Sequence, residues 1–146
     1  MRLYLDTCSL HRPLDERTQA RIALEADAVL AILSLCEAGT AFLVASEPLA
    51  LEVDGNPDPE KRAIVHEVLA RAKVFAVIDE ETEQRVRELS TGGFKTFDAL
   101  HLAVAEAAQV DYFCTCDDRL LKRARGRSDL RVRVVSPLEL AQEIVP

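Results

Sequence analysis

Four acidic residues occupy positions where an α/β protein can assemble a reactive site. Asp6 follows the apolar run Leu3–Leu5, and Asp117 follows the run YFCTC in the last third of the chain. Asp98 lies at the start of an expected helix, and Glu52 lies in a short helix after another expected strand. Several carboxylates in one partly buried crevice repel each other unless a cation neutralises them. Oxygen ligands of this kind suit Mg²⁺ or Mn²⁺, which can activate a water molecule and stabilise charge on a phosphoryl group.

Each acid also has a purely local interpretation. Asp6 and Asp117 could cap the turn or helix that follows, because a carboxylate accepts hydrogen bonds from backbone N–H groups there. Asp98, two residues after an expected Thr96 N-cap, could favour the positive end of its helix. Glu52 could be a solvated helix residue. The pattern across the chain therefore carries more weight than any single acid.

Strands and helices alternate along the sequence. Five segments rich in β-branched or aromatic residues predict strands: Arg2–Leu5, Ala41–Ala45, Val74–Ile78, Tyr112–Thr115 and Arg131–Val135. Helices are expected at Arg17–Ala38, Glu47–Val53, Pro59–Ala72, Glu80–Leu89, Phe97–Ala108, Arg119–Arg125 and Pro137–Ile144. This order predicts an α/β fold with a parallel sheet covered on both faces. Ligands of such sheets bind outside the carboxyl ends of the strands, where Asp6 and Asp117 are expected.

Composition limits the class of protein. The 146 residues match a single domain spanning 1–146, and 49% hydrophobic with 29% charged residues predict a folded globular chain. No apolar stretch approaches the roughly 20 residues of a membrane span, and no signal peptide is visible, so a cytoplasmic location is expected. The four cysteines have neither disulfide-scaffold nor zinc spacing. The net charge of −7 argues against a nucleic-acid binder, although Lys122–Arg133 is locally basic.

Several other chemistries lack their motifs. The sequence contains no G-x-x-x-x-G-K-[ST] phosphate loop, no G-x-G-x-x-G dinucleotide motif and no Ser-His-Asp order. A phosphatase or phosphoryl-transfer domain would carry a second acid beside Asp6, but the chain reads Asp6-Thr7-Cys8. A carboxylate-bound metal therefore remains the favoured chemistry.

Three stretches together resemble a bacterial PIN-domain protein: LYLDTCSLHRP, SEPLALE and TFDALHLAVAEAAQVDYFCTCDDRLLKRA. The resemblance covers essentially the whole chain, and its strongest part is the DALHLA helix followed by a strand ending in T-x-D. It implies a three-layer α/β/α domain with a central parallel sheet of about five strands. It also implies a Mg²⁺- or Mn²⁺-dependent ribonuclease, with the toxin of a toxin–antitoxin pair as the expected role. The alternative is a catalytically degenerate PIN-like domain that binds a protein or RNA.

The resemblance also assigns roles to individual residues. It implies the catalytic set Asp6, Glu52, Asp98 and Asp117, with Asp6, Asp98 and Asp117 as metal ligands and Thr7, Ser9 and Thr115 as supporting hydroxyls. Glu47 competes with Glu52 for the place of the helical acid. Cys8 stands where the family often has Asn or Ser, so Thr7 or Ser9 is expected to supply that contact.

Basic residues near the acids are candidates for contact with RNA phosphates. Lys95 lies at the start of the Asp98 helix, and Arg119 and Lys122 follow the last acid; a solvated helix face is the alternative for the latter two. For His11 and Arg12 the alternatives are a phosphate contact and a solvated loop. His101, one helical turn after Asp98, could order a ligand or could be a core histidine. The expected partners are an RNA substrate, an antitoxin protein and a second copy of the chain, and no membrane.

Overall fold

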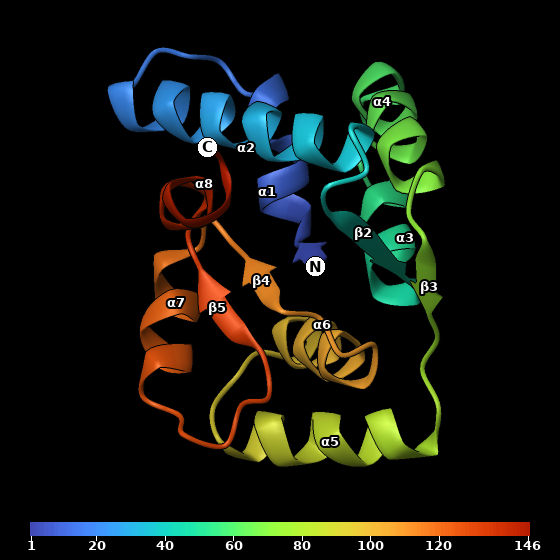
Figure 1. The fold of residues 1–146 in the computed structure, drawn as a ribbon. Coiled ribbons are helices and arrows are strands. Elements are labelled where there is room, and N and C mark those ends of the chain that lie inside the picture. Colours follow the sequence, from blue (N-terminus) through green and yellow to red (C-terminus); the bar gives the residue numbers. More distant parts are fainter.

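The computed structural model describes residues 1–146 and contains one five-stranded sheet in which every neighbouring pair is parallel. The strand order is β3-β2-β1-β4-β5, with β1 in the centre (Figure 1). The strands are β1 (Arg2–Leu5), β2 (Phe42–Ser46), β3 (Val74–Ala76), β4 (Tyr112–Cys114) and β5 (Arg133–Val135). Chain order reverses between β2 and β4, on either side of β1, and this is where a ligand site is expected in such a fold.

Helices cover both faces of the sheet. They are α1 (Thr7–His11), α2 (Ala20–Glu37), α3 (Glu47–Asp54), α4 (Pro59–Ala70), α5 (Glu80–Thr91), α6 (Thr96–Ala107), α7 (Asp118–Arg125) and α8 (Pro137–Ile144). A short 3₁₀ turn, Arg12–Leu14, follows α1. Figure 1 shows α2 and α5 on opposite sides of the sheet; α8 packs on α2, and α6 packs on α5. No helix is long and apolar enough to cross a bilayer.

The central strand is buried on both faces. Leu3, Tyr4 and Leu5 are at most 1% exposed, because helices cover both sides of β1. The Tyr4 ring stacks on that of Phe113 in β4, with the ring centroids 5.1 Å apart. Burial of this kind holds the carboxyl ends of β1 and β4 side by side.

The expected α/β fold with a parallel sheet is confirmed, but several boundaries differ. The third strand ends at Ala76 instead of Ile78, because its partner β2 turns into α3 after Ser46 and offers no further backbone groups. The fifth strand begins at Arg133 instead of Arg131, opposite Tyr112 in β4. Pairing with the neighbouring strand sets these ends, and the β-propensity of the residues along the chain does not reveal where that pairing stops.

Two local predictions were wrong. Residues Thr7–His11 form a helix that the sequence did not predict, because this short segment has too few apolar residues to show a helical period. Thr96 is not the N-cap of α6; Lys95 takes that position in an extended conformation, without a capping side chain. Asp98 is therefore the third residue of the helix, where its charge still faces the positive helix end.

Candidate functional site

The four predicted acids line one cavity at the carboxyl ends of the central strands. Asp6, Glu52, Asp98 and Asp117 all face it, together with Thr7, Cys8, Arg12, His101 and Cys116. The parallel register brings them together: Leu5 pairs with Cys114, so the residues after β1 and β4 leave the sheet at the same level. The backbone N–H of Asp6 donates to the carbonyl oxygen of Cys114 at 3.1 Å. Residues more than 100 positions apart thus meet at this edge.

Asp6 is both a helix cap and a buried carboxylate. Its Oδ1 accepts hydrogen bonds from the backbone N–H of Ser9 (3.1 Å) and the thiol of Cys8 (3.0 Å), which leaves Oδ2 available to a ligand. The residue is 6% exposed, and this burial raises its pKa well above the ordinary value. An ionised carboxylate at this place is unfavourable without a positive partner, so the environment favours a bound cation.

Glu52 is held from two sides. It lies on α3, which Ser46 caps by accepting a hydrogen bond from the Leu49 N–H at 3.2 Å. Its Oε1 accepts hydrogen bonds from the Thr7 hydroxyl (2.6 Å) and from Nε2 of His101, and Oε2 remains free. Desolvation would raise the pKa of Glu52, but the hydrogen bonds from His101 and Thr7 outweigh it and the pKa is lowered. Glu52 is therefore kept as a carboxylate, whereas Glu47 does not line the cavity.

Asp98 and Asp117 both line the cavity and the neighbouring hollow. Burial and the nearby charge of Asp117 raise the pKa of Asp98. Asp117 caps α7: its Oδ1 accepts hydrogen bonds from the N–H groups of Arg119 (2.9 Å) and Leu120 (3.3 Å). The capping interpretation of Asp6 and Asp117 is thus confirmed, and it is compatible with a functional role because each cap uses one oxygen only.

Each of the three hydroxyls that were predicted to support the site has its own partner. The Thr7 hydroxyl donates to Glu52, while that of Ser9 donates to the carbonyl oxygen of Cys114 at 3.1 Å. Thr115 accepts a hydrogen bond from the Asp117 N–H at 3.1 Å and lies 3.6 Å from the Cys8 sulfur. The Cys8 thiol, rather than either neighbouring hydroxyl, donates to Asp6.

The basic residues divide into those near the acids and those away from them. Lys95 and Arg119 line a neighbouring hollow that includes Asp98 and Asp117, whereas Lys122 does not line it. Arg123, which the sequence did not single out, does line it; its guanidinium covers Gly93, whose φ of +102° requires glycine. A helical wheel of α7 anchored on the buried Leu120 would have separated Lys122 from Arg123.

Arg12 lines the cavity itself. Its guanidinium lies 3.0 Å from Asp15 and 3.5 Å from the buried carboxylate of Glu25, so it is an anchored cation rather than a solvated loop residue. His11 lies in the adjoining groove, where Nδ1 contacts the Thr7 carbonyl oxygen and Nε2 contacts the Asn56 amide. His101 is buried and bonded through both ring nitrogens.

The donor set fits a hydrated hard cation better than a closed cage. Asp6 and Asp117 each keep one oxygen for the protein and one for the cavity, and no hydrogen bond engages the carboxylate of Asp98. No three His, Cys, Asp or Glu side chains converge closely enough to form a preformed cage. Mg²⁺ commonly binds through one or two carboxylates and retains several waters, and Mn²⁺ accepts the same oxygen ligands. The residues that would hold it are Asp6, Asp98 and Asp117.

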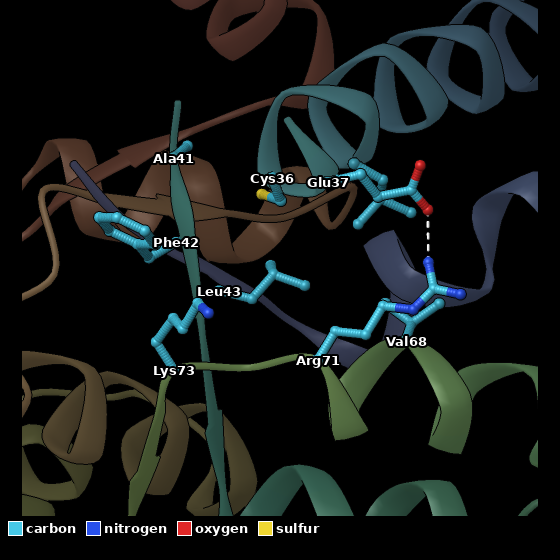
Figure 2. A pocket seen from close by; sticks show the side chains of 9 residues that line it. Cys36, Glu37, Ala41, Phe42, Leu43, Val68, Arg71 and Lys73 are labelled. Atoms are coloured by element: carbon cyan, nitrogen blue, oxygen red, sulfur yellow. Dashed lines mark hydrogen bonds and ion pairs between the residues drawn. The ribbon is translucent and has the colours of Figure 1, made fainter. Parts of the chain in front are cut away.

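A second hollow lies at the other end of β2 and has a different character. Figure 2 shows Leu43 on the same side of β2 as Cys36 of α2 and Phe42 on the other side, with the ion pair between Arg71 and Glu37 near the edge of the hollow. Most of its lining is apolar, and Glu37 is its only acid. The acidic cavity is therefore the candidate active site.

A parallel sheet with carboxylates gathered at the ends of its central strands defines an α/β domain with an acidic site. Comparison with protein families matches residues 3–126 to the PIN domain. The chain belongs to the PIN domain family, whose members are generally nucleases. Comparison with the curated proteins finds no match.

Solved structures show the same fold at low sequence identity. VapBC2 from Rickettsia felis, crystallised with a DNA fragment from its promoter, is 14% identical with a TM-score of 0.65, over 93% of this chain and 98% of that one. PAE2754 from Pyrobaculum aerophilum is 15% identical with a TM-score of 0.53, over 98% of this chain and 97% of that one. The expected PIN fold is thereby confirmed.

Proposed function

We propose that this protein is a Mg²⁺- or Mn²⁺-dependent endoribonuclease. The observation that carries the proposal is the cavity that Asp6, Glu52, Asp98 and Asp117 line together, with carboxylate oxygens left free of protein hydrogen bonds. Family membership supports phosphodiester hydrolysis as the reaction class. A toxin role, with an antitoxin as protein partner, is part of the proposal and is supported by the likeness to VapBC2. A homodimer is proposed on family resemblance alone.

The residues of the chain divide the work of this reaction. A bound divalent cation would supply a nucleophilic water and charge stabilisation at the phosphate. Asp6, Asp98 and Asp117 would bind this cation in the cavity at the strand ends, and Glu52 presents a fixed carboxylate to the same cavity. Lys95 and Arg119 lie where the phosphates flanking the cleaved bond would pass.

Removal of the metal is the first test. We expect Mn²⁺ or Mg²⁺ to raise the melting temperature, because a ligand that binds only the folded state stabilises it by about 2.7 kcal/mol at 100 times Kd. The same ions should activate cleavage of a fluorogenic RNA, and excess EDTA should remove both effects. Sodium chloride at matched ionic strength serves as the control, because a monovalent cation does not replace a divalent one at clustered carboxylates. An RNA that binds without being cleaved at millimolar Mn²⁺ would favour the degenerate binding module instead.

The basic residues give a separate prediction about RNA binding. Replacing either Lys95 or Arg119 alone by Ala should weaken RNA binding several-fold at low salt, and reduce the slope of log K against log salt by roughly one for the lost phosphate contact. Lys122→Ala is the matched control, because Lys122 lies on the same helix as Arg119 but outside the hollow. Filter binding at several salt concentrations measures this. Equal losses in the control and test variants would show that only net charge matters.

A further inference from the structure

A chain of buried hydrogen bonds leads from the middle of the fold to Glu52. The Tyr4 hydroxyl lies 2.7 Å from the Ser46 hydroxyl and 2.6 Å from Nδ1 of His101, and Nε2 of the same imidazole contacts Oε1 of Glu52. Ser46 and Tyr4 are fully buried, and His101 is 3% exposed. The chain joins β1, β2 and α6 to the carboxylate on α3, which is itself partly exposed in the cavity.

The hydrogen-bond directions along this chain are mutually consistent. Ser46 already accepts a hydrogen bond from the Leu49 N–H, which leaves its own proton for Tyr4. The Tyr4 hydroxyl then donates a hydrogen bond to Nδ1 of His101. Nε2–H of the same ring donates to Glu52, since an ionised carboxylate can only accept. The partner of one ring nitrogen sets the tautomer of the other. The imidazole is thus fixed as a donor toward the site.

Two donors then converge on one oxygen of Glu52. Thr7 and His101 both donate to Oε1, so the carboxylate is held at one oxygen while Oε2 has no hydrogen-bond partner in the protein. A glutamate side chain has several rotatable bonds, and holding it in one geometry carries an entropic cost. Packing fixes the donor side of this arrangement in advance, because the Tyr4 ring stacks on Phe113 and meets the His101 ring edge-on.

We propose that Tyr4 and His101 are positioning residues that hold Glu52 in its reactive orientation. The inference rests on the proposed nuclease function and assigns these two residues a part in it. Neither side chain is required to touch RNA: Tyr4 is fully buried, and His101 borders the cavity but is only 3% exposed. Their effect is therefore on turnover and on the field at the cation, and RNA affinity is unaffected.

The test uses two variants that differ in what they remove. Tyr4→Phe deletes only the hydroxyl and keeps the stacked ring, while His101→Leu deletes the donor to Glu52. We expect kcat for Mn²⁺-dependent RNA cleavage to fall by about 10- to 100-fold in His101→Leu, with a smaller loss in Tyr4→Phe and KM unchanged in both. His101→Gln, whose amide N–H can replace Nε2–H, should recover part of the loss.

Tyr112→Phe is the matched control. Tyr112 is the first residue of β4, at the opposite end of the strand from the cavity, and its hydroxyl donates to Glu143 of α8 at 2.7 Å, so its loss should leave kcat unchanged. Mn²⁺ affinity, read from the rise in melting temperature during a titration, should also fall several-fold in His101→Leu but not in the control. Metal-free melting temperatures show whether each variant folds.

The outcomes separate the two proposals. If the wild-type protein neither binds Mn²⁺ nor cleaves RNA, the nuclease function fails and the positioning role fails with it. If the wild type cleaves RNA while folded Tyr4→Phe and His101→Leu retain its kcat and Mn²⁺ affinity, the positioning role alone is overturned. An equal loss in KM and kcat without rescue by His101→Gln would assign the pair a structural role and also overturn it.

Discussion

Asp98→Asn is expected to reduce Mn²⁺-dependent RNA cleavage by about 1,000-fold or more while leaving the fold intact. The change keeps the size of the side chain but removes its charge. A divalent cation in the cavity would therefore lose one of its negatively charged ligands. The metal-free variant should be at least as stable as the wild type, because burial and the charge of Asp117 already disfavour the ionised form of Asp98 and raise its pKa. Asp6→Asn should behave alike, since burial raises the pKa of Asp6 as well.

Asp118→Asn provides the matched control for this experiment. Asp118 is the direct neighbour of Asp117, but its carboxylate is exposed and pairs with Arg21 at 2.6 and 2.8 Å, outside the cavity. Initial rates of RNA cleavage and metal-free melting curves are measured on all variants in parallel. Wild-type rates in Asp98→Asn, or an equal loss in Asp118→Asn, would contradict the assignment of the site.

The second large effect concerns stability at a place remote from the site. Glu106→Ala is expected to lower the free energy of unfolding by about 1–3 kcal/mol, because it leaves the buried donors of Arg85 and Arg131 without their acceptor. Arg85 keeps only its more exposed partners, Glu88 and Asp129. The Glu106 side chain is 2% exposed, and its two oxygens accept from Arg85 at 2.7 and 3.1 Å. One of them also accepts from the backbone N–H of Arg131 at 2.9 Å. This cluster joins α5 and α6 to the segment before β5.

An exposed ion pair supplies the comparison. Arg17 and Asp27 are 2.6 Å apart, but their side chains are 41% and 67% exposed, so Asp27→Ala should cost less than about 1 kcal/mol. Urea unfolding followed by circular dichroism measures both variants, with the slope m compared to check that the unfolding mechanism is unchanged. A cost for Glu106→Ala no greater than that of the control would show that the buried cluster does not stabilise the fold.

Local patterns in the sequence were sufficient for the main elements. Leu3–Leu5 is an uninterrupted apolar run, and such a run predicts a strand buried on both faces. The alternation of strands with helices then predicts a parallel sheet, and both predictions are confirmed. The unpredicted helix Thr7–His11 shows the limit, because it is defined by the cap at Asp6 rather than by an apolar stripe.

The candidate site divides in the same way. That Asp6 and Asp117 lie at the same edge of the sheet follows from strand direction alone, and the sequence was enough to predict it. The choice between Glu52 and Glu47 was not accessible, because both lie on one short helix and only its packing turns Glu52 into the cavity. Lys122 and Arg123 on α7 differ from that case, because a helical wheel anchored on Leu120 would have separated them, and the structure places only Arg123 at the hollow.

By itself, the sequence determined the class of fold, its family and the edge of the sheet at which the acids gather. Only the tertiary structure decided which oxygen of each carboxylate is free and which side chains hold it. Tyr4 reads in the sequence as one more apolar strand residue, yet its hydroxyl orients His101, 97 positions later, toward Glu52. The physical reason is range: periodicity reports burial along one segment, whereas a hydrogen bond depends on the order in which distant strands and helices are brought together.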